Sequence, residues 1–521
     1  MEIRCETIRA RDGHLLPVLH AKDTVIHLGS CYRGDYAAEC WVSSYVSKRT
    51  ENVIFFGMGD CQILNELTER VPGTIVVYEP ESLVHKQMKV SALYKKLIKS
   101  RKVKFFYGDC HQQLGQTIKE LLDDDWVERT MVVAHPGYQG IYEESWNILQ
   151  KICQQNCDDI TFMRAPLKRF MASMIHNQIA NLSRMKGGVP LRRLKSVWNP
   201  DLPVILVSAG PSLEKNVEEL KNVAGRALIF CVDAALQTLL SHDIIPDVMV
   251  SVDSAKDMSC FDHVPCQDIP LLASSNTRKE IFERGVGTVI WGYDHALAMQ
   301  IMDRAGIPVP KVPYYLGVST AVYSSVVELG ARVIILVGQD LAFSDTGKTH
   351  TSDRDESSLQ TERLEAEGYD GGKVWSRMDW MEFKKWFEKM LILYPDHTVI
   401  NATEGGVRIK GTKQQRLSDV IKQLPDVRNE FTDWLKDEKN QISVKEDGVI
   451  REQMHQCVQD LNMIRSWGYH KTFFEKEYKK LPIMNLILSY MMILDDEREE
   501  RFEKALAFVR DAFRQEGWID E

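Results

Sequence analysis

The chain has 521 residues, of which 44% are hydrophobic and 27% are charged, and its formal net charge is −9. This length and composition predict about three globular domains. The negative balance argues against a nucleic-acid-binding surface over the whole protein, so we expect no nucleic-acid partner. The longest apolar run falls short of the ~20 residues that cross a membrane, and the N-terminus lacks the apolar core of a signal peptide. We therefore expect a cytoplasmic protein without membrane insertion.

The first region, residues 1–159, contains four apolar β-branched runs separated by amphipathic stretches, which predicts buried parallel strands in βαβ units. The runs begin at Asn52, Thr74, Lys102 and Thr130. Gly57 and Gly59 follow the first run, and Glu79 ends the second at the spacing of a dinucleotide-binding fold. Gln62 stands where that pattern has its third glycine. We therefore predict a degenerate, non-catalytic Rossmann-like domain.

Residues 160–200 predict a long helix followed by a linker, because Gly187, Gly188 and Pro190 interrupt the helical pattern. Residues 201–415 contain apolar runs that mostly end in a small or acidic residue: PVILVSAG, ALIFCVD, DVMVSVD, IPLLASS, TVIWGYD and RVIILVGQD. In an open parallel sheet the carboxyl ends of the strands form the ligand crevice, so these endings predict a binding edge. Residues 416–521 lack such runs and predict a helical C-terminal domain. The expected fold class is therefore α/β.

The first candidate binding feature is the turn from Ser208 to Ser212, which contains Gly210 and Pro211 and leads from a strand into a helix. A glycine lets the backbone approach a phosphate closely, and a helix N-terminus offers free N–H groups. A plain strand-to-helix turn would have the same pattern. The turn alone is therefore a weak signal for a phosphate site.

Two further features of this kind follow along the chain. Asp233 and Asp253 end two apolar runs, where carboxylates receive sugar hydroxyls or a base edge, hold a metal, or cap the next helix. Gly317, Ser319 and Thr320 stand at the start of another predicted helix. Their hydroxyl and N–H groups suit phosphate oxygens, and a simple helix cap is the competing interpretation.

The strand RVIILVG ends in Gly338, Gln339 and Asp340, and His350 follows on a polar loop. A histidine on such a loop is a candidate acid or base, although a solvated surface histidine fits as well. The later loop from Asn401 to Ile409 contains Glu404 and Arg408. Its glycines allow it to lie over a ligand, with Arg408 countering negative charge, or to form a structural turn.

Taken together, these segments resemble the motility accessory factor (Maf) family, the flagellin glycosyltransferases. The resemblance rests on the order and spacing of VSAGPSL, the two strand-end acids, GVSTAVYSSVVELGARVIILVGQDLAFSDTGKTHT, a WFEKM helix and INATEGGVRIKGT. It covers the central domain, and the flanking regions fit the family's three-part layout. It implies a Rossmann-like N-terminal domain, a central parallel-sheet domain similar to bacterial sialyltransferases, and a helical C-terminal domain.

The resemblance to the sialyltransferases also implies roles for individual residues. Gly210, Pro211 and Ser212 match their phosphate-side turn, while Asp233 and Asp253 stand where they have two nucleotide-contacting asparagines. Gly317, Ser319 and Thr320 match a phosphate-contacting turn, and Gly338 and Asp340 match a strand end. Ser208, Asn276, Gln339, Glu404 and Arg408 complete the expected nucleotide and sugar pocket. The sialyltransferase histidine that precedes the MDWMEFKKWFEKM helix is missing, because GGKVWSR occupies that stretch.

The implied reaction is transfer of a nonulosonic acid from a CMP-activated donor to Ser or Thr hydroxyls of flagellin, with inversion. His350 or Asp340 would accept the proton of the acceptor hydroxyl. No cofactor is certain, and a divalent metal, Mg²⁺ or Mn²⁺, stays open. Two alternatives are an ATP-dependent transferase similar to the MptE-like 6-hydroxymethylpterin pyrophosphokinases and a non-catalytic flagellin-binding assembly factor.

Overall fold

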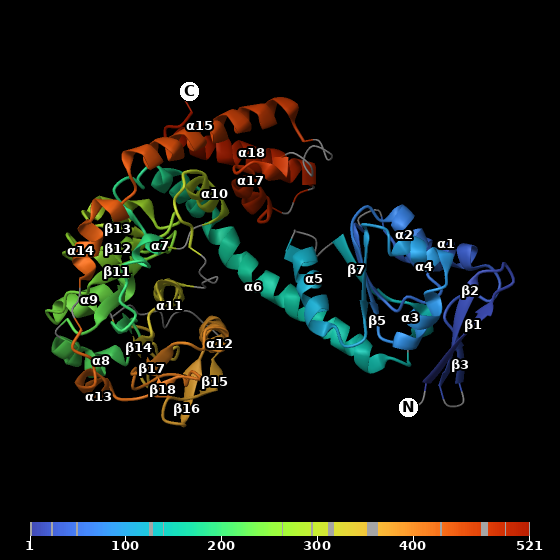
Figure 1. The fold of residues 1–521 in the computed structure, drawn as a ribbon, viewed down its shortest axis with the longest axis horizontal. Helices are drawn as coiled ribbons and strands as arrows, with labels where there is room; N and C mark the ends of the chain where they lie inside the picture. The colour runs from blue at the N-terminus through green and yellow to red at the C-terminus, as the bar shows by residue number, and fades with distance from the viewer. Residues whose placement is uncertain are drawn as a thin grey trace. The chain divides into compact units, whose positions relative to one another are not determined.

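The computed structural model describes residues 3–21, 24–47, 50–123, 129–138, 140–223, 225–262, 264–292, 295–310, 317–351, 363–427, 430–469, 478–494, 496 and 498–519, except for the side chains of 123, 158–166 and 479. The chain forms two compact units, Met1–Leu167 and Lys168–Glu521. Helix α6 (Glu143–Leu182) begins in the first unit and ends in the second (Figure 1).

The first unit contains a four-stranded parallel sheet in the order β6-β5-β4-β7. Its strands are β4 (Asn52–Phe56), β5 (Ile75–Glu79), β6 (Val103–Tyr107) and β7 (Thr130–Ala134). The four predicted strands are therefore confirmed. Every residue of β4 and β5 is buried, which explains why their sequences are continuous apolar runs rather than alternating ones.

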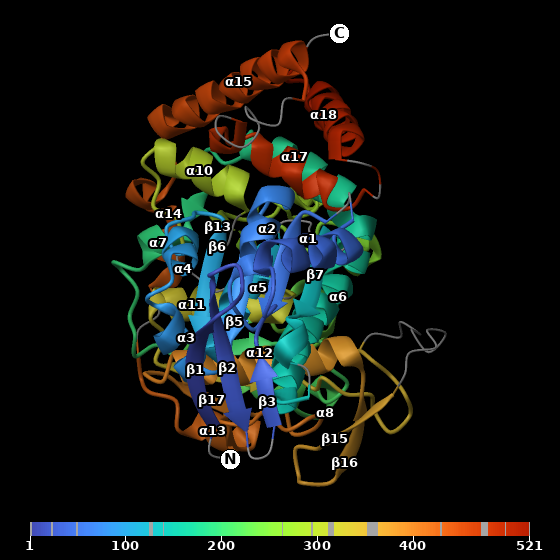
Figure 2. The same ribbon diagram turned by 90° about the vertical axis from the view of Figure 1, so that its right-hand side faces the viewer.

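A second, antiparallel sheet in this unit was not predicted. It consists of β1 (Ile3–Arg9), β2 (Leu15–Ala21) and β3 (Thr24–His27), which lie side by side in Figure 2. Helix α3 packs against β1 and β2. The helices of the unit, besides the start of α6, are α1 (Gly34–Tyr45), α2 (Gln62–Arg70), α3 (Ser82–Met88), α4 (Ala92–Leu97) and α5 (His111–Asp123).

The described residues of the second unit form a nine-stranded parallel sheet in the order β18-β17-β14-β9-β10-β11-β12-β13-β8. The six predicted strands are β9 (Val204–Val207), β10 (Leu228–Val232), β11 (Val248–Ser251), β12 (Leu271–Ala273), β13 (Val289–Trp291) and β14 (Val333–Val337). Strand β8 (Val189–Pro190) lies in the segment predicted as a linker and pairs with β13. Strands β17 (Thr398–Asn401) and β18 (Lys413–Gln414) extend the other edge.

The strand order places a topological switch point between β9 and β14. The chain runs outward from β9 to β13 on one side, and then returns to place β14 and β17 on the other side. Connections on either side of such a point diverge and leave a crevice at the carboxyl ends of the two strands, where ligands bind in open α/β sheets. The first unit has the same arrangement between β4 and β7.

Helices and one hairpin complete the second unit. They are α7 (Leu191–Leu194), α8 (Leu213–Asn216), α9 (Asp233–Ser241), α10 (Ala296–Arg304), α11 (Val318–Leu329), α12 (Met378–Leu393), α13 (Leu417–Lys422), α14 (Phe431–Lys436), α15 (Val444–Trp467), α17 (Met484–Met491) and α18 (Arg498–Gln515), with the hairpin β15 (Leu364–Glu367) and β16 (Lys373–Ser376). Helices α15, α17 and α18 pack together, and α10 contacts α15 and α17 (Figure 1). The expected fold class, including the helical C-terminal region, is confirmed. No helix within the described residues is long and apolar enough to cross a membrane.

Candidate ligand site at the carboxyl edge of the larger sheet

The turn after β9 and the turn after β14 meet at the switch point. The Gly210 N–H donates to the Gly338 carbonyl at 2.8 Å. The Ser212 N–H donates to the Asp340 carboxylate at 3.2 Å, and the Ser212 hydroxyl donates to it at 2.7 Å. A Cβ atom on Gly210 would overlap Asp340 Oδ2, so this glycine is required by close approach. The two predicted features therefore form one site.

Asp340 is the most strongly perturbed acid of this site. Its residue is 7% exposed. Burial raises its pKa to about 6, while hydrogen bonds from Ser212 and the charge of Lys215 act in the opposite direction. Gly405 and Gly406 approach Asp340 from the loop after β17, and a Cβ on Gly406 would overlap the Asp340 backbone. The turn after β9 and the loop after β17 thus both have glycines where they approach Asp340.

The neighbouring candidates are held mainly by contacts within the protein. The Ser208 hydroxyl donates to Gln339 Oε1 at 2.6 Å. Glu404 adopts a positive φ of 58°, and its Oε1 accepts from Asn216 Nδ2 at 3.1 Å and from the Leu417 N–H at 3.0 Å. Glu404 therefore lies beside the turn but serves to connect three segments.

Arg408 lies apart from these contacts. Its Nη1 is 3.0 Å from Glu367 Oε1, and both side chains are 48% exposed. An exposed pair of this kind adds little stability and leaves the guanidinium at the surface. Among the residues expected in the loop after β17, the structure brings Glu404 but not Arg408 into contact with the switch-point turns.

His350 lies on a segment that is tied to the turn after β9. The Thr351 N–H donates to the Ala209 carbonyl at 3.0 Å, and the Thr351 hydroxyl lies 3.0 Å from that of Thr238. The His350 ring contacts the Thr349 hydroxyl through Nδ1 at 3.0 Å. The structure therefore places this histidine next to the switch point, although it is 140 residues from Gly210 in sequence.

Asp233 is buried in an ion pair that sequence reasoning missed. Its Oδ1 is 2.6 Å from Lys256 Nζ, and its Oδ2 accepts from the Ser251 hydroxyl at 2.6 Å. Burial acts to lower the pKa of Lys256, but the Asp233 carboxylate outweighs it and raises the pKa. Asp233 thus does not cap α9. Asp253, in contrast, is exposed and accepts from the Ala255 N–H at 3.0 Å.

Asn276 belongs to a buried polar network at the ends of β12 and β13. The Asn276 side-chain amide contacts His295 Nε2, and the Asn276 backbone carbonyl accepts from Asn177 Nδ2 of α6 at 3.1 Å. Asn181, one turn further along α6, donates to the Ser275 and Thr277 carbonyls at 2.9 and 2.7 Å. Burial lowers the pKa of His295 to about 4, so its ring is neutral at physiological pH. The HNQIAN segment could have indicated this network in the sequence. Its two asparagines lie four residues apart on one face of a helix, and buried side-chain amides require hydrogen-bond partners.

The Gly317 turn begins α11 as predicted. The Gly317 N–H donates to the Thr320 hydroxyl at 2.9 Å, and that hydroxyl is 2.8 Å from the Gly317 carbonyl. Ser319 is partly buried in the first turn of this 12-residue helix. The Thr320 hydroxyl therefore stabilises the turn, while Ser319 stands at the end of the helix that favours anions.

The acids do not gather at one point of this edge. Within the described ranges, no group of three or more His, Cys, Asp or Glu side chains is placed to hold a metal ion. Both carboxylate oxygens of Asp233 already contact Ser251 and Lys256. Asp233 could bind a metal only by giving up a buried ion pair.

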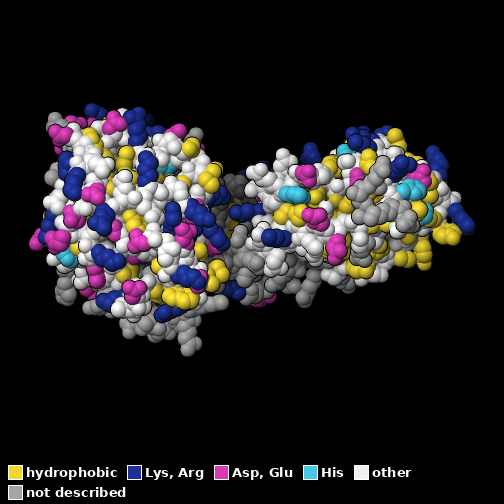
Figure 3. All heavy atoms as spheres, turned by 90° about the horizontal axis from the view of Figure 1, so that it is seen from below, with side chains coloured by type: hydrophobic (Ala, Val, Ile, Leu, Met, Phe, Trp, Pro, Cys, Tyr) yellow, Lys and Arg dark blue, Asp and Glu magenta, His cyan; other side chains and the backbone are white. Residues whose placement is uncertain are grey.

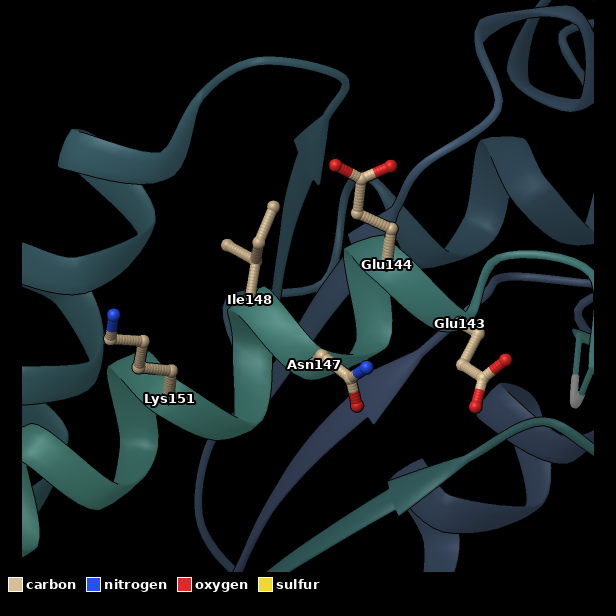
Figure 4. A pocket seen from close by; sticks show the side chains of 5 residues that line it. All are labelled: Glu143, Glu144, Asn147, Ile148 and Lys151. Atoms are coloured by element: carbon tan, nitrogen blue, oxygen red, sulfur yellow. The ribbon is translucent and has the colours of Figure 1, made fainter.

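Two surface features lie outside this site. A depression lined by Glu143, Glu144, Asn147, Ile148 and Lys151 is formed by one face of α6 in the first unit (Figure 4). Its lining comes from a single helix, so no polar groups converge on it from a second element. On the face seen in Figure 3, Lys and Arg side chains are interspersed with Asp and Glu.

Comparisons with known proteins agree with this architecture. Residues 176–346 match the family model described as 6-hydroxymethylpterin diphosphokinase MptE-like. An uncharacterized protein of Treponema pallidum (strain Nichols) is 23% identical over 172 residues, which are 30% of this chain and 73% of that protein. The structure of a Maf glycosyltransferase from Magnetospirillum magneticum AMB-1 has a TM-score of 0.60 and 14% identity, and the likeness covers 98% of this chain and 90% of that chain. The resemblance to the Maf family and to the MptE-like superfamily is thus confirmed at the level of the fold.

Proposed function

We propose that this protein is a cytoplasmic glycosyltransferase that moves a nonulosonic acid from a CMP-activated donor to Ser or Thr of flagellin. The observation that carries the proposal is the fold of a Maf glycosyltransferase over 98% of the chain. The contact between the turns after β9 and β14 at the switch point supports it independently, because ligands of open α/β sheets bind at such a point.

In this proposal the donor lies along the carboxyl edge of the larger sheet. The first turn of α11, with Ser319, faces the phosphate, and its donors stabilise the charge that develops on the departing nucleotide. The turn after β9 lies beside the phosphate. Asp253 and Asn276 bind the sugar and the nucleotide further along this edge. Lys256 joins them as a charged donor held in place by Asp233.

His350 is the proposed base. Asp340 is occupied by the N–H and hydroxyl of Ser212, whereas His350 lies on the segment fixed to Ala209. The base would take the proton from the acceptor hydroxyl while that oxygen attacks the anomeric carbon and the CMP oxygen leaves. A single displacement of this kind inverts the anomeric centre.

The proposal is tested with purified protein, CMP-activated nonulosonic acids and flagellin, read by intact mass. We expect a mass increase of one or more sugar units, and flagellin that stays unmodified with every donor tried would contradict the proposal. His350→Ala should lower kcat by about 10²–10⁴-fold and change the KM of the donor little. His455→Ala, on α15 and packed against Trp518, is the matched control and should retain full activity.

A second candidate function follows from the family model over residues 176–346. An MptE-like enzyme would transfer diphosphate from ATP to a hydroxymethylpterin. Asp253 and Asp257 would be its candidate acids, yet each accepts the N–H two residues later, of Ala255 and Ser259. ATP-dependent turnover of 6-hydroxymethylpterin would favour this function, and absence of binding to CMP, CDP and ATP in calorimetry would favour an assembly factor.

A further inference from the structure

We propose that binding of the donor phosphate at the β9–β14 crevice is coupled to the uptake of one proton by Asp340. This carboxylate lies where a ligand anion would meet the turn after β9. The inference rests on the proposed function of this crevice as the donor site, and it adds a pH-dependent step to donor binding.

The geometry identifies Asp340 as an internal anion. Backbone N–H groups and serine hydroxyls of turns are donors that phosphate groups commonly use. Here Asp340 accepts both of them, from Ser212, at 3.2 and 2.7 Å. Gly210, Gly405 and Gly406 leave the space that Asp340 fills. A phosphate that approaches this turn therefore meets a carboxylate that is already in place.

A phosphate and an ionised carboxylate that lie close together, away from water, repel each other. Burial has already raised the pKa of Asp340 to about 6, so protonation of the carboxyl needs only a small further shift at neutral pH. An adjacent phosphate supplies that shift. By reciprocity, a protonated Asp340 binds the phosphate more tightly than an ionised one does.

The other charged groups around Asp340 do not remove this conflict. Lys215 of α8 lowers the pKa of Asp340, and its Nζ donates to the Glu404 carbonyl at 3.4 Å. The Glu404 carboxylate, on the loop after β17, is turned to Asn216 and Leu417. His350, on the segment bonded to Ala209, is a further titratable group near this turn and needs its own control.

Isothermal titration calorimetry with the methyl phosphodiester of CMP tests the coupling, because this probe has no group that titrates near neutral pH. Titrations of the full chain in buffers of different ionisation enthalpy give the number of protons taken up. We expect close to one proton per ligand near pH 7, little uptake near pH 5, and an affinity that falls by up to about tenfold per pH unit above about pH 6. Asp340→Asn should abolish the uptake and the pH dependence.

Two further variants separate Asp340 from its neighbours. Ser212→Ala removes a donor to the carboxylate, so the onset of proton uptake should move to higher pH. His350→Gln should leave the uptake in place. Binding without proton uptake between about pH 5 and 8 would overturn the inference and leave the proposed function standing. The inference would also be overturned if His350→Gln lost the proton uptake and Asp340→Asn retained it. Absence of any binding would overturn both.

Discussion

Among single residues, a buried carboxylate in each unit accepts hydrogen bonds from the turn that follows a central strand. In the second unit Asp340 accepts the donors of Ser212. In the first unit Glu79, which is fully buried, accepts from the Met58 N–H at 2.8 Å and from the Tyr138 hydroxyl at 2.5 Å. Glu79 stands where a dinucleotide-binding fold has its ribose-binding acid. Glu79 is engaged by the glycine turn, and the non-catalytic character of this unit stays a prediction.

The stability of the first unit should depend on pH through the protonation of Glu79. Burial raises its pKa from 4.5 to about 7, although three hydrogen bonds act against this. Because the folded-state pKa is raised, the associated stability is complete below about pH 4.5 and is lost as pH rises through about 7. We expect the opening free energy of β4 and β5 to fall by about 3 kcal/mol over this window, measured by hydrogen exchange. Glu79→Gln should remove this pH dependence, and exposed Glu69→Gln should retain it; an unchanged profile in Glu79→Gln would contradict the assignment.

The buried pair of Asp233 and Lys256 predicts a large loss of stability when one partner is removed. Asp233→Asn keeps the shape of the side chain but leaves the Lys256 charge, only 12% exposed, without its counter-ion. Breaking a buried pair in this way costs about 3–5 kcal/mol, which hydrogen exchange of β10 and β11 would report. Asp253→Asn, on an exposed side chain, should change it by less than about 0.5 kcal/mol. Equal effects of the two variants would show that the ion pair is not formed.

At the scale of elements, α6 positions the turn after β12. Asn177 donates to the Ser254 and Asn276 carbonyls, and Asn181 donates to those of Ser275 and Thr277. Four backbone carbonyls are thereby paired with uncharged amide donors. A turn fixed in this way holds Asn276 in one place and needs no ligand to order it.

Substitution of Asn181 tests this clamp. Asn181→Ala leaves two buried carbonyls without partners, so the turn should lose about 2 kcal/mol of local stability. Hydrogen exchange of residues 271–278 measures this directly. Ser183→Ala, directly after the end of this helix, removes only a bond to the Ala180 carbonyl and should leave the turn protected. Unchanged exchange in Asn181→Ala would contradict the clamp.

At the scale of the whole molecule, the chain contains two parallel sheets, each with its own switch point. The candidate donor residues all lie within Lys168–Glu521. The switch point of the first unit is filled by Glu79 and by Tyr138, whose ring a Cβ on Gly57 would meet within 2.5–2.6 Å. The two units therefore differ in what their carboxyl edges offer, since the second keeps the buried lysine Lys256 there.

This division predicts which variants alter donor binding. Glu79→Gln should leave the affinity of the full chain for CMP within about twofold, whereas Lys256→Met should weaken it by tenfold or more, about 1.4 kcal/mol. Calorimetry at one pH measures both. A tenfold loss in Glu79→Gln would mean that the first unit takes part in binding the nucleotide.

The elements, and the sheet edge that carries the candidate site, could be predicted from the amino-acid sequence. Continuous apolar runs such as those at Val204 and Val333 predict buried parallel strands, and the small or acidic residues that follow them mark one edge. These signals are local, because hydrophobic periodicity and turn chemistry act within a few residues. The short strand β8 and the antiparallel β1–β3 sheet gave no comparable signal, since β8 spans only two residues and β1 is mostly exposed or half-buried.

The contacts between distant side chains could not be predicted in this way, because they depend on the arrangement of the strands. Asp340 contacts Ser212 across 128 positions, and Asn181 contacts Thr277 across 96. Such pairs depend on strand order, which places β14 beside β9 and thereby joins two turns that the sequence keeps far apart. Burial then set the state of each group, because an acid withdrawn from water becomes easier to protonate and a lysine beside an acid keeps its charge. The sequence identified the candidate residues, whereas the fold determined which of them pair and which carry a charge.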